Sequence, residues 1–168
     1  GKMAEDIDEM EKMLNDYLQY AKSQIEEKSV NFDLTETIIS LLKKHDPSKY
    51  EFYSSKNIQF NGRKNLIKRC ILNILENGLV YGNKIFVEVK KSVNSLIVIV
   101  EDNGPGIPKS EYINVFRPFY RVDKSRGLNK SGVGLGLSVA QDIAKSHGGN
   151  ISLSESKHKG LLVKISLP

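Results

Sequence analysis

Two asparagines four residues apart are the first side chains in this sequence that could hold a metal ion. Asn73 and Asn77 lie in a helix-like segment, where a spacing of four places them within about 40° of each other on one face. Their carboxamide oxygens can ligate Mg²⁺ without adding negative charge, which suits a metal already bound to phosphates. Tyr81 follows one helical turn later. A solvated helix face is the simpler alternative for the pair.

A carboxylate at the end of an apolar strand is the second candidate. Asp102 follows the apolar run 96–100 and is followed by Gly104, Gly106 and Ile107. A carboxylate only accepts hydrogen bonds, so it could accept one from the exocyclic amine of adenine. The glycines would let a planar base approach the backbone. An ordinary turn has the same composition.

Alternating glycines before a predicted helix form the third candidate. Free N–H groups at such a helix start can cradle phosphate. The run is not a P-loop, because no Gly-Lys-Ser/Thr follows, and its glycine spacing differs from the dinucleotide fingerprint. It comprises Gly132, Gly134, Leu135, Gly136 and Leu137.

A basic segment separates the second and third candidates. Residues 117–131 hold five Lys or Arg side chains, Arg121 among them, against the single acid Asp123. We expect a mobile loop that can close over a triphosphate. A solvated loop is the alternative.

The predicted elements that position these candidates give an α+β fold with several helices on one face of a mixed sheet. In the predicted helix 63–81, Ile67, Ile71, Ile74, Leu75 and Gly78 form an apolar arc that should face the sheet, and Cys70 should be a small core residue. The remaining predictions are strands 30–34, 50–54, 57–60, 150–154 and 161–167, helices 35–44 and 134–147, and a hairpin of 84–90 with 95–101.

The first 30 residues differ from the rest. Met3, Ile7, Met10, Leu14, Tyr17 and Ala21 recur at heptad spacing, so they predict a helix whose stripe needs a helical partner. The helix begins in mid-pattern, without a capping residue, as a truncated helix would.

Charge and composition narrow the class of protein. The net charge of +5 divides into −4 for residues 1–30 and +9 for residues 31–168. A basic body suggests a polyanionic ligand, and nucleic acid is one alternative. The single cysteine excludes an internal disulfide and favours a reducing, cytoplasmic setting. We find no signal peptide and no apolar run near the ~20 residues of a membrane span.

The order and spacing of the candidates carry more information than any of them alone. Asn-x3-Asn-x3-Tyr, Asp-x-Gly-x-Gly, Phe-x-Pro-Phe and Gly-x-Gly-x-Gly-Leu follow one another between residues 73 and 137. This series resembles the N, G1, F and G2 boxes of sensor histidine kinases, over residues 57–168. Lys68-Arg69 and Tyr81-Gly82-Asn83 look most like the osmolarity-sensor subgroup.

The resemblance implies a Bergerat-type two-layer α/β sandwich, with three helices on one face of a mixed sheet, that binds Mg-ATP. It assigns Asp102 to the adenine amine, Asn73 and Asn77 to Mg²⁺ and phosphates, and Arg121 to the γ-phosphate. Val80 and Val133 depart from the family, since a basic residue and a hydroxyl are common there. The other nucleotide-binding positions that it implies are Tyr81, Gly104, Gly106, Ile107, Phe119, Gly132, Gly134, Leu135, Gly136 and Leu137.

The resemblance also implies the domain organisation and the partners. Residues 1–28 would end the second helix of a dimerisation and phosphoacceptor hairpin, and residues 29–168 would be the catalytic domain. None of His45, His147 and His158 stands in the phosphoacceptor motif; we expect His147 at a helix end and the other two in exposed turns. The expected partners are that hairpin of the same parent protein and a response regulator, not nucleic acid. The parent would be a homodimer anchored in the membrane, with this part in the cytoplasm.

Three rival functions remain open. A hydrolytic ATPase of the gyrase and Hsp90 type would have a glutamate one turn before the asparagine, where this chain has Asn73, and Glu76 should point about 100° away from Asn77. Val80 favours a nucleotide sensor without turnover. The basic body favours a nucleic-acid binder, but no interleaving of aromatic and basic residues supports it.

Overall fold

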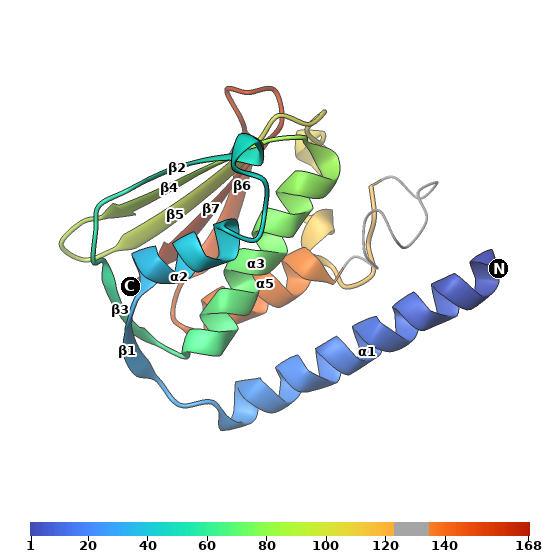
Figure 1. Cartoon of the computed structure of the whole chain (residues 1–168), viewed down its shortest axis with the longest axis horizontal. Coiled ribbons are helices and arrows are strands. Elements are labelled where there is room, and N and C mark those ends of the chain that lie inside the picture. The colour runs from blue at the N-terminus through green and yellow to red at the C-terminus, as the bar shows by residue number, and fades with distance from the viewer. Residues whose placement is uncertain (123–134) are drawn as a thin grey trace.

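The computed structural model describes residues 1–122 and 135–168 and has two layers, a sheet and a set of helices (Figure 1). The order of elements agrees with the prediction, and most boundaries shift by one or two residues. The elements are α1 (Lys2–Glu26), β1 (Val30–Asp33), α2 (Leu34–Leu42), a 3₁₀ turn (Pro47–Lys49), β2 (Tyr50–Ser54), β3 (Gln59–Gly62), α3 (Lys64–Tyr81), β4 (Ile85–Lys91), β5 (Leu96–Asp102), 3₁₀ turns at Lys109–Glu111 and Asn114–Phe116, α5 (Gly136–Ser146), β6 (Asn150–Glu155) and β7 (Leu161–Leu167).

The main sheet has five strands in the order β2-β4-β5-β7-β6. β2 pairs with β4 in parallel, and the other pairs are antiparallel, so the sheet is mixed as predicted. Burial alternates along β5 and β7, where every second residue is buried. One face of the sheet therefore carries the core, and the other remains partly exposed.

Among the described residues, helices α2, α3 and α5 cover the core face of the sheet (Figure 1). The apolar arc predicted for α3 is buried along its whole length, and Cys70 lies within it as expected. Burial raises the pKa of the Cys70 thiol to about 12, so the thiol stays protonated and serves as a core side chain. This packing fixes which face of α3 is left for other contacts.

The long helix α1 extends along the helical layer, and its N-terminal end lies furthest from the body (Figure 1). The predicted stripe is exposed: Met3 by 77%, Ile7 by 57% and Leu14 by 57%. A different face contacts the body, through Tyr20, which is 5% exposed. The expectation that the stripe needs a partner outside this chain therefore stays open. No helix in the described ranges is long and apolar enough to cross a membrane.

A cluster of hydrogen bonds joins the end of α1 to α3 and α5. The Arg63 guanidinium donates to the Gln24 carbonyl (2.7 Å) and to Ser146 Oγ (2.6 Å), and its backbone N–H donates to His147 Nε2 (3.0 Å). Arg63 is also the N-cap residue of α3 and makes no side-chain cap bond. Glu27, just past α1, supplies that cap, because its two carboxylate oxygens accept from the first N–H groups of α3 (2.7 and 3.0 Å).

We expect Glu27→Ala to lower the free energy of unfolding by about 1–2 kcal/mol, because it removes a helix cap and a carboxylate at the positive end of α3. Chemical denaturation measures the change. Glu26→Ala is the matched control, since Glu26 is exposed and forms no described hydrogen bond. Equal stability of the two variants would show that the cap contributes nothing.

Candidate functional site

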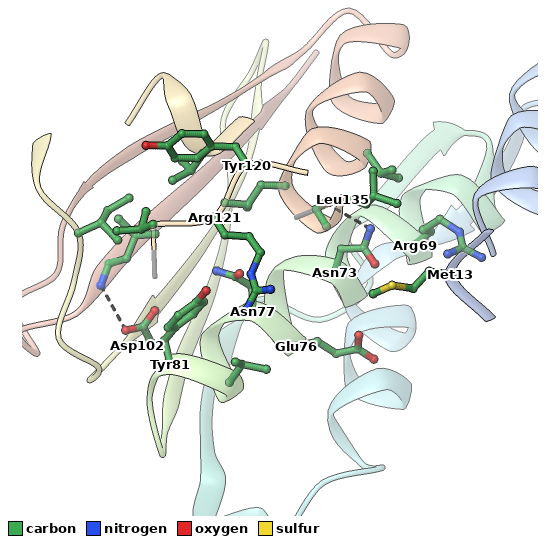
Figure 2. Close-up of a pocket in the computed structure, with 18 of the residues that line it drawn as sticks. Met13, Arg69, Asn73, Glu76, Asn77, Tyr81, Asp102, Tyr120, Arg121 and Leu135 are labelled. Atoms are coloured by element: carbon green, nitrogen blue, oxygen red, sulfur yellow. Dashed lines mark hydrogen bonds between the residues drawn. The ribbon is translucent and has the colours of Figure 1, made fainter. Parts of the chain in front are cut away.

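A cavity of about 370 Å³ lies between α3, the start of α5, the end of β5 and α1. Most of the residues predicted for a nucleotide site line it, although they come from separate elements (Figure 2). The predicted residues in its wall are Asn73, Asn77, Tyr81, Asp102, Gly106, Ile107, Arg121, Leu135, Gly136 and Leu137.

Four predicted residues are not in the described wall. Phe119 is 68% exposed and lies outside the cavity. Gly104 does not line it but donates its backbone N–H to Asp102 Oδ1 (2.9 Å), so it acts through that carboxylate. Gly132 and Gly134 lie outside the described residues, as does most of the loop predicted over residues 117–131.

Asp102 is a buried carboxylate at the end of β5, with 4% of its surface exposed. Its Oδ1 accepts hydrogen bonds from the backbone N–H groups of Gly104 (2.9 Å) and Leu161 (3.3 Å). Among the described residues, none donates to Oδ2. Burial raises the pKa of Asp102, and the two backbone donors oppose that rise. One oxygen is thus fixed by the protein, and the other can accept a hydrogen bond from a ligand.

Two glycines leave room for this carboxylate. A Cβ atom on Gly160 would lie 2.0 Å from Asp102 Oδ1, and one on Gly104 would lie 2.5 Å from the Tyr81 carbonyl oxygen. Any side chain at either position would displace backbone or the carboxylate. The turn before β7 therefore takes part in the site, which the sequence did not indicate.

Asn73, Asn77 and Tyr81 recur every four residues on the face of α3 that is turned away from the core (Figure 2). The Asn73 side chain donates to the Gly136 carbonyl (3.3 Å), which ties α3 to the start of α5 and leaves the Asn73 amide oxygen for a ligand. Figure 2 shows the Arg121 guanidinium next to Asn77. Polar oxygens and a cation therefore meet halfway along the cavity.

The N-terminus of α5 forms part of the same wall. Its N-cap residue, Leu135, makes no side-chain cap bond, and Leu135, Gly136 and Leu137 all line the cavity. In the described part of the chain no side chain caps the first N–H groups of α5, and these groups and the positive end of the helix dipole favour an anion there.

Sequence reasoning missed several residues of the wall. Arg69 lies one turn before Asn73 and lines the cavity. Glu76 also lines it, and its carboxylate points away from Asn77, as expected (Figure 2). α1 closes one side with residues that belong to a different part of the chain, Met13, Asp16, Tyr17 and Tyr20.

The three histidines stand outside the cavity wall. His147 ends α5 as expected, and its ring contacts the Arg63 N–H and the Ile143 carbonyl. His45 and His158 are in turns, but the expectation that they are exposed was wrong, since both are half-buried. His158 stacks on Phe86 with ring centroids 3.6 Å apart.

The arrangement fits a nucleotide. The Asp102 end offers a hydrogen-bond acceptor beside apolar side chains such as Ile107, which suits a base. The middle offers carboxamide oxygens, a guanidinium and a helix N-terminus, which suit phosphates and a divalent cation. Positioning and charge neutralisation are the main requirements of phosphoryl transfer.

Comparison with known proteins agrees with this chemistry. The family described as histidine kinase-, DNA gyrase B- and HSP90-like ATPase matches residues 62–168. Sensor histidine kinase GtrS of Pseudomonas aeruginosa is 33% identical over 99% of this chain, and histidine-protein kinase ArlS of Staphylococcus aureus is 29% identical over 96%. Those alignments cover 35% and 38% of the relatives, so this chain spans about a third of their length.

Solved structures show the same fold. A mycobacterial sensor histidine kinase, MprB, superposes with a TM-score of 0.72 at 24% identity, covering 84% of this chain and 97% of that one. The catalytic domain of histidine kinase ThkA gives 0.73 at 22% identity, over 84% of this chain and 95% of that one. Full-length ShkA in complex with AMPPNP gives 0.78 at 17% identity, over 94% of this chain and 35% of that one.

Proposed function

The chain belongs to the family of histidine kinase-, DNA gyrase B- and HSP90-like ATPases, and on that premise we propose that it is the catalytic part of a sensor histidine kinase. It would bind Mg-ATP and transfer the γ-phosphoryl group to a histidine of a phosphoacceptor domain in two-component signalling. The observation that carries the proposal is that Asp102, the Asn73–Asn77 pair and the N-terminus of α5 all line one and the same cavity. The structural neighbour bound to AMPPNP, ShkA, supports it.

Each residue has a proposed role. Asp102 would accept a hydrogen bond from the adenine amine, and Tyr81 would pack near the base. Arg121 would contact the phosphates, with the γ-phosphate as its expected partner. Gly136, together with Gly132 and Gly134, would cradle the phosphates.

The carboxamide oxygens of Asn73 and Asn77 would hold Mg²⁺ together with phosphate oxygens. The ion, when bound, would neutralise charge on the phosphates. The hydrogen bond from Asn73 to Gly136 would keep this pair aligned with the start of α5.

The wider context is also a proposal. Residues 1–28 would belong to the dimerisation and phosphoacceptor hairpin, and residues 29–168 would form the ATP-binding domain. The parent protein would be a membrane-anchored homodimer that passes the phosphoryl group to a response regulator. The closer similarity to osmolarity sensors stays a prediction.

Calorimetric titration of the chain with ATP, in the presence and absence of Mg²⁺, tests the nucleotide site. We expect saturable binding of one nucleotide per chain that Mg²⁺ strengthens. Binding of DNA or RNA at moderate salt, with no binding of ATP, would instead support the nucleic-acid alternative.

A further inference from the structure

Arg69 is a half-buried cation in the cavity wall, and the proposed function gives it no role. It lies four residues before Asn73, so it extends the column formed by Asn73, Asn77 and Tyr81 along α3. Figure 2 shows these residues in that order across the cavity, with Asp102 beside Tyr81 at one end and Arg69 beside Met13 of α1 at the other.

Within residues 1–122 and 135–168, the Arg69 side chain makes no hydrogen bond or ion pair. Asp16 of α1 lines the same cavity but forms no ion pair with it. Arg63, the N-cap residue of α3, is different, because its guanidinium donates hydrogen bonds to Gln24 and Ser146. A partly desolvated guanidinium without a partner is unfavourable, so the position of Arg69 calls for an anion in the cavity.

The column indicates which anion Arg69 would meet. At 1.5 Å per helical residue, Arg69 lies about 18 Å along the α3 axis from Tyr81 and about 6 Å beyond Asn73. A nucleotide whose base is at Asp102 and Tyr81 extends its phosphates toward Arg69, and the terminal phosphate reaches furthest. Arg121 approaches at the level of Asn77, so the two cations address different parts of the phosphate chain.

We propose that Arg69 binds the terminal phosphate of ATP and thereby makes the site prefer a triphosphate to a diphosphate. The planar guanidinium can donate two parallel hydrogen bonds to phosphate oxygens, which an amide or ammonium group cannot reproduce. This inference rests on the proposed function and names one more residue of the same site.

The test is the ratio of ATP to ADP affinity, measured by calorimetry with Mg²⁺ for the unaltered chain and three variants. We expect Arg69→Gln to weaken ATP about ten- to a hundredfold and ADP by less than about threefold. Arg69→Lys should give an intermediate ratio. Lys68→Gln is the matched control: it removes one positive charge from the same helix, but Lys68 lies in a separate shallow hollow with Asp33 and Glu36. Its ATP to ADP ratio should equal that of the unaltered chain.

Equal loss of ATP and ADP affinity in Arg69→Gln, or an unchanged ratio in a variant that remains folded by circular dichroism, would overturn the proposal. If Arg69→Gln does not fold, the ratio for Arg69→Lys decides in the same way. If the unaltered chain binds neither nucleotide, the proposed function itself fails, and this inference fails with it. Normal binding combined with an unchanged ratio removes this inference alone.

Discussion

Asp102→Asn should weaken ATP binding about ten- to a hundredfold while leaving the fold intact. A hydrogen bond to a charged group contributes about 1.5–3 kcal/mol, which sets this range. Because the Gly104 and Leu161 N–H groups both need an acceptor, the amide oxygen of an asparagine should turn toward them and accept their hydrogen bonds. Its NH₂ group would then face the adenine amine, donor against donor.

The same substitution should not destabilise the protein at neutral pH. Burial raises the pKa of Asp102 in the folded state, so the folded protein binds its proton more tightly than the unfolded chain does. That contribution is present at low pH and is lost as the pH rises through the unfolded and then the folded pKa. The variant has no carboxyl group at this position and does not lose this contribution. The difference in melting temperature, variant minus unaltered chain, should therefore increase between about pH 4 and pH 7.

Calorimetry and thermal melts across this pH range measure both effects. Glu101→Gln is the matched control, because Glu101 is the neighbouring acid, does not line the cavity and accepts a hydrogen bond from Ser156. Unchanged ATP affinity in Asp102→Asn would remove Asp102 from the site. A lower melting temperature at pH 7 would show that its ionised form stabilises the fold.

Asn77→Ala should abolish the strengthening of ATP binding by Mg²⁺ and leave the weaker, metal-free binding. Loss of a residue that merely supports a metal ligand lowers metal affinity about ten- to a hundredfold, so loss of a ligand should do at least as much. Asn77 is a cleaner test than Asn73, whose side chain also holds Gly136. Titrations with Mg²⁺ and with a chelator separate the metal-dependent part.

Asn65→Ala is the control for this change, since Asn65 is an exposed asparagine three turns earlier on α3, outside the cavity wall. It should bind ATP like the unaltered chain under both conditions. An equal loss of affinity with and without Mg²⁺ in Asn77→Ala would indicate that Asn77 shapes the pocket and does not hold the metal.

Local patterns in the sequence were sufficient for the order of elements and for much of the candidate site. The burial of Ile67, Ile71 and Ile74 on α3 was predictable because their helical spacing indicates which face of the helix is apolar. That face also determined where Asn73 and Asn77 would point. The glycine turn after Asp102 was readable because few residues other than glycine tolerate such close backbone contacts.

Contacts between distant segments were not readable. Nothing near Glu27 indicates that it caps a helix that begins 37 residues later. The local sign is at the helix itself, where the N-cap residue Arg63 cannot accept hydrogen bonds from the first N–H groups. Tyr20 packs on the body, although it is not part of the heptad stripe that the sequence predicted. Arg69 and Glu76 line the cavity together with residues of α1. Helical periodicity within α3 could not predict this, because it says nothing about where α1 packs.

The histidines decide what the isolated chain can do. His147 lies at the far end of α5, about 16 Å along the helix from Gly136, and neither His45 nor His158 lines the cavity. In-line transfer requires the nucleophile at about 3–3.5 Å from the phosphorus. None of the three is placed to receive the phosphoryl group.

Incubation with γ-labelled ATP, with and without an added phosphoacceptor hairpin from a related sensor histidine kinase, tests the central proposal most directly. We predict that the chain alone stays unlabelled and that the added hairpin acquires an acid-labile, base-stable label. Release of inorganic phosphate without labelling of the hairpin would contradict the account and favour a hydrolytic ATPase. Rapid labelling of the chain itself would contradict the placement of its histidines.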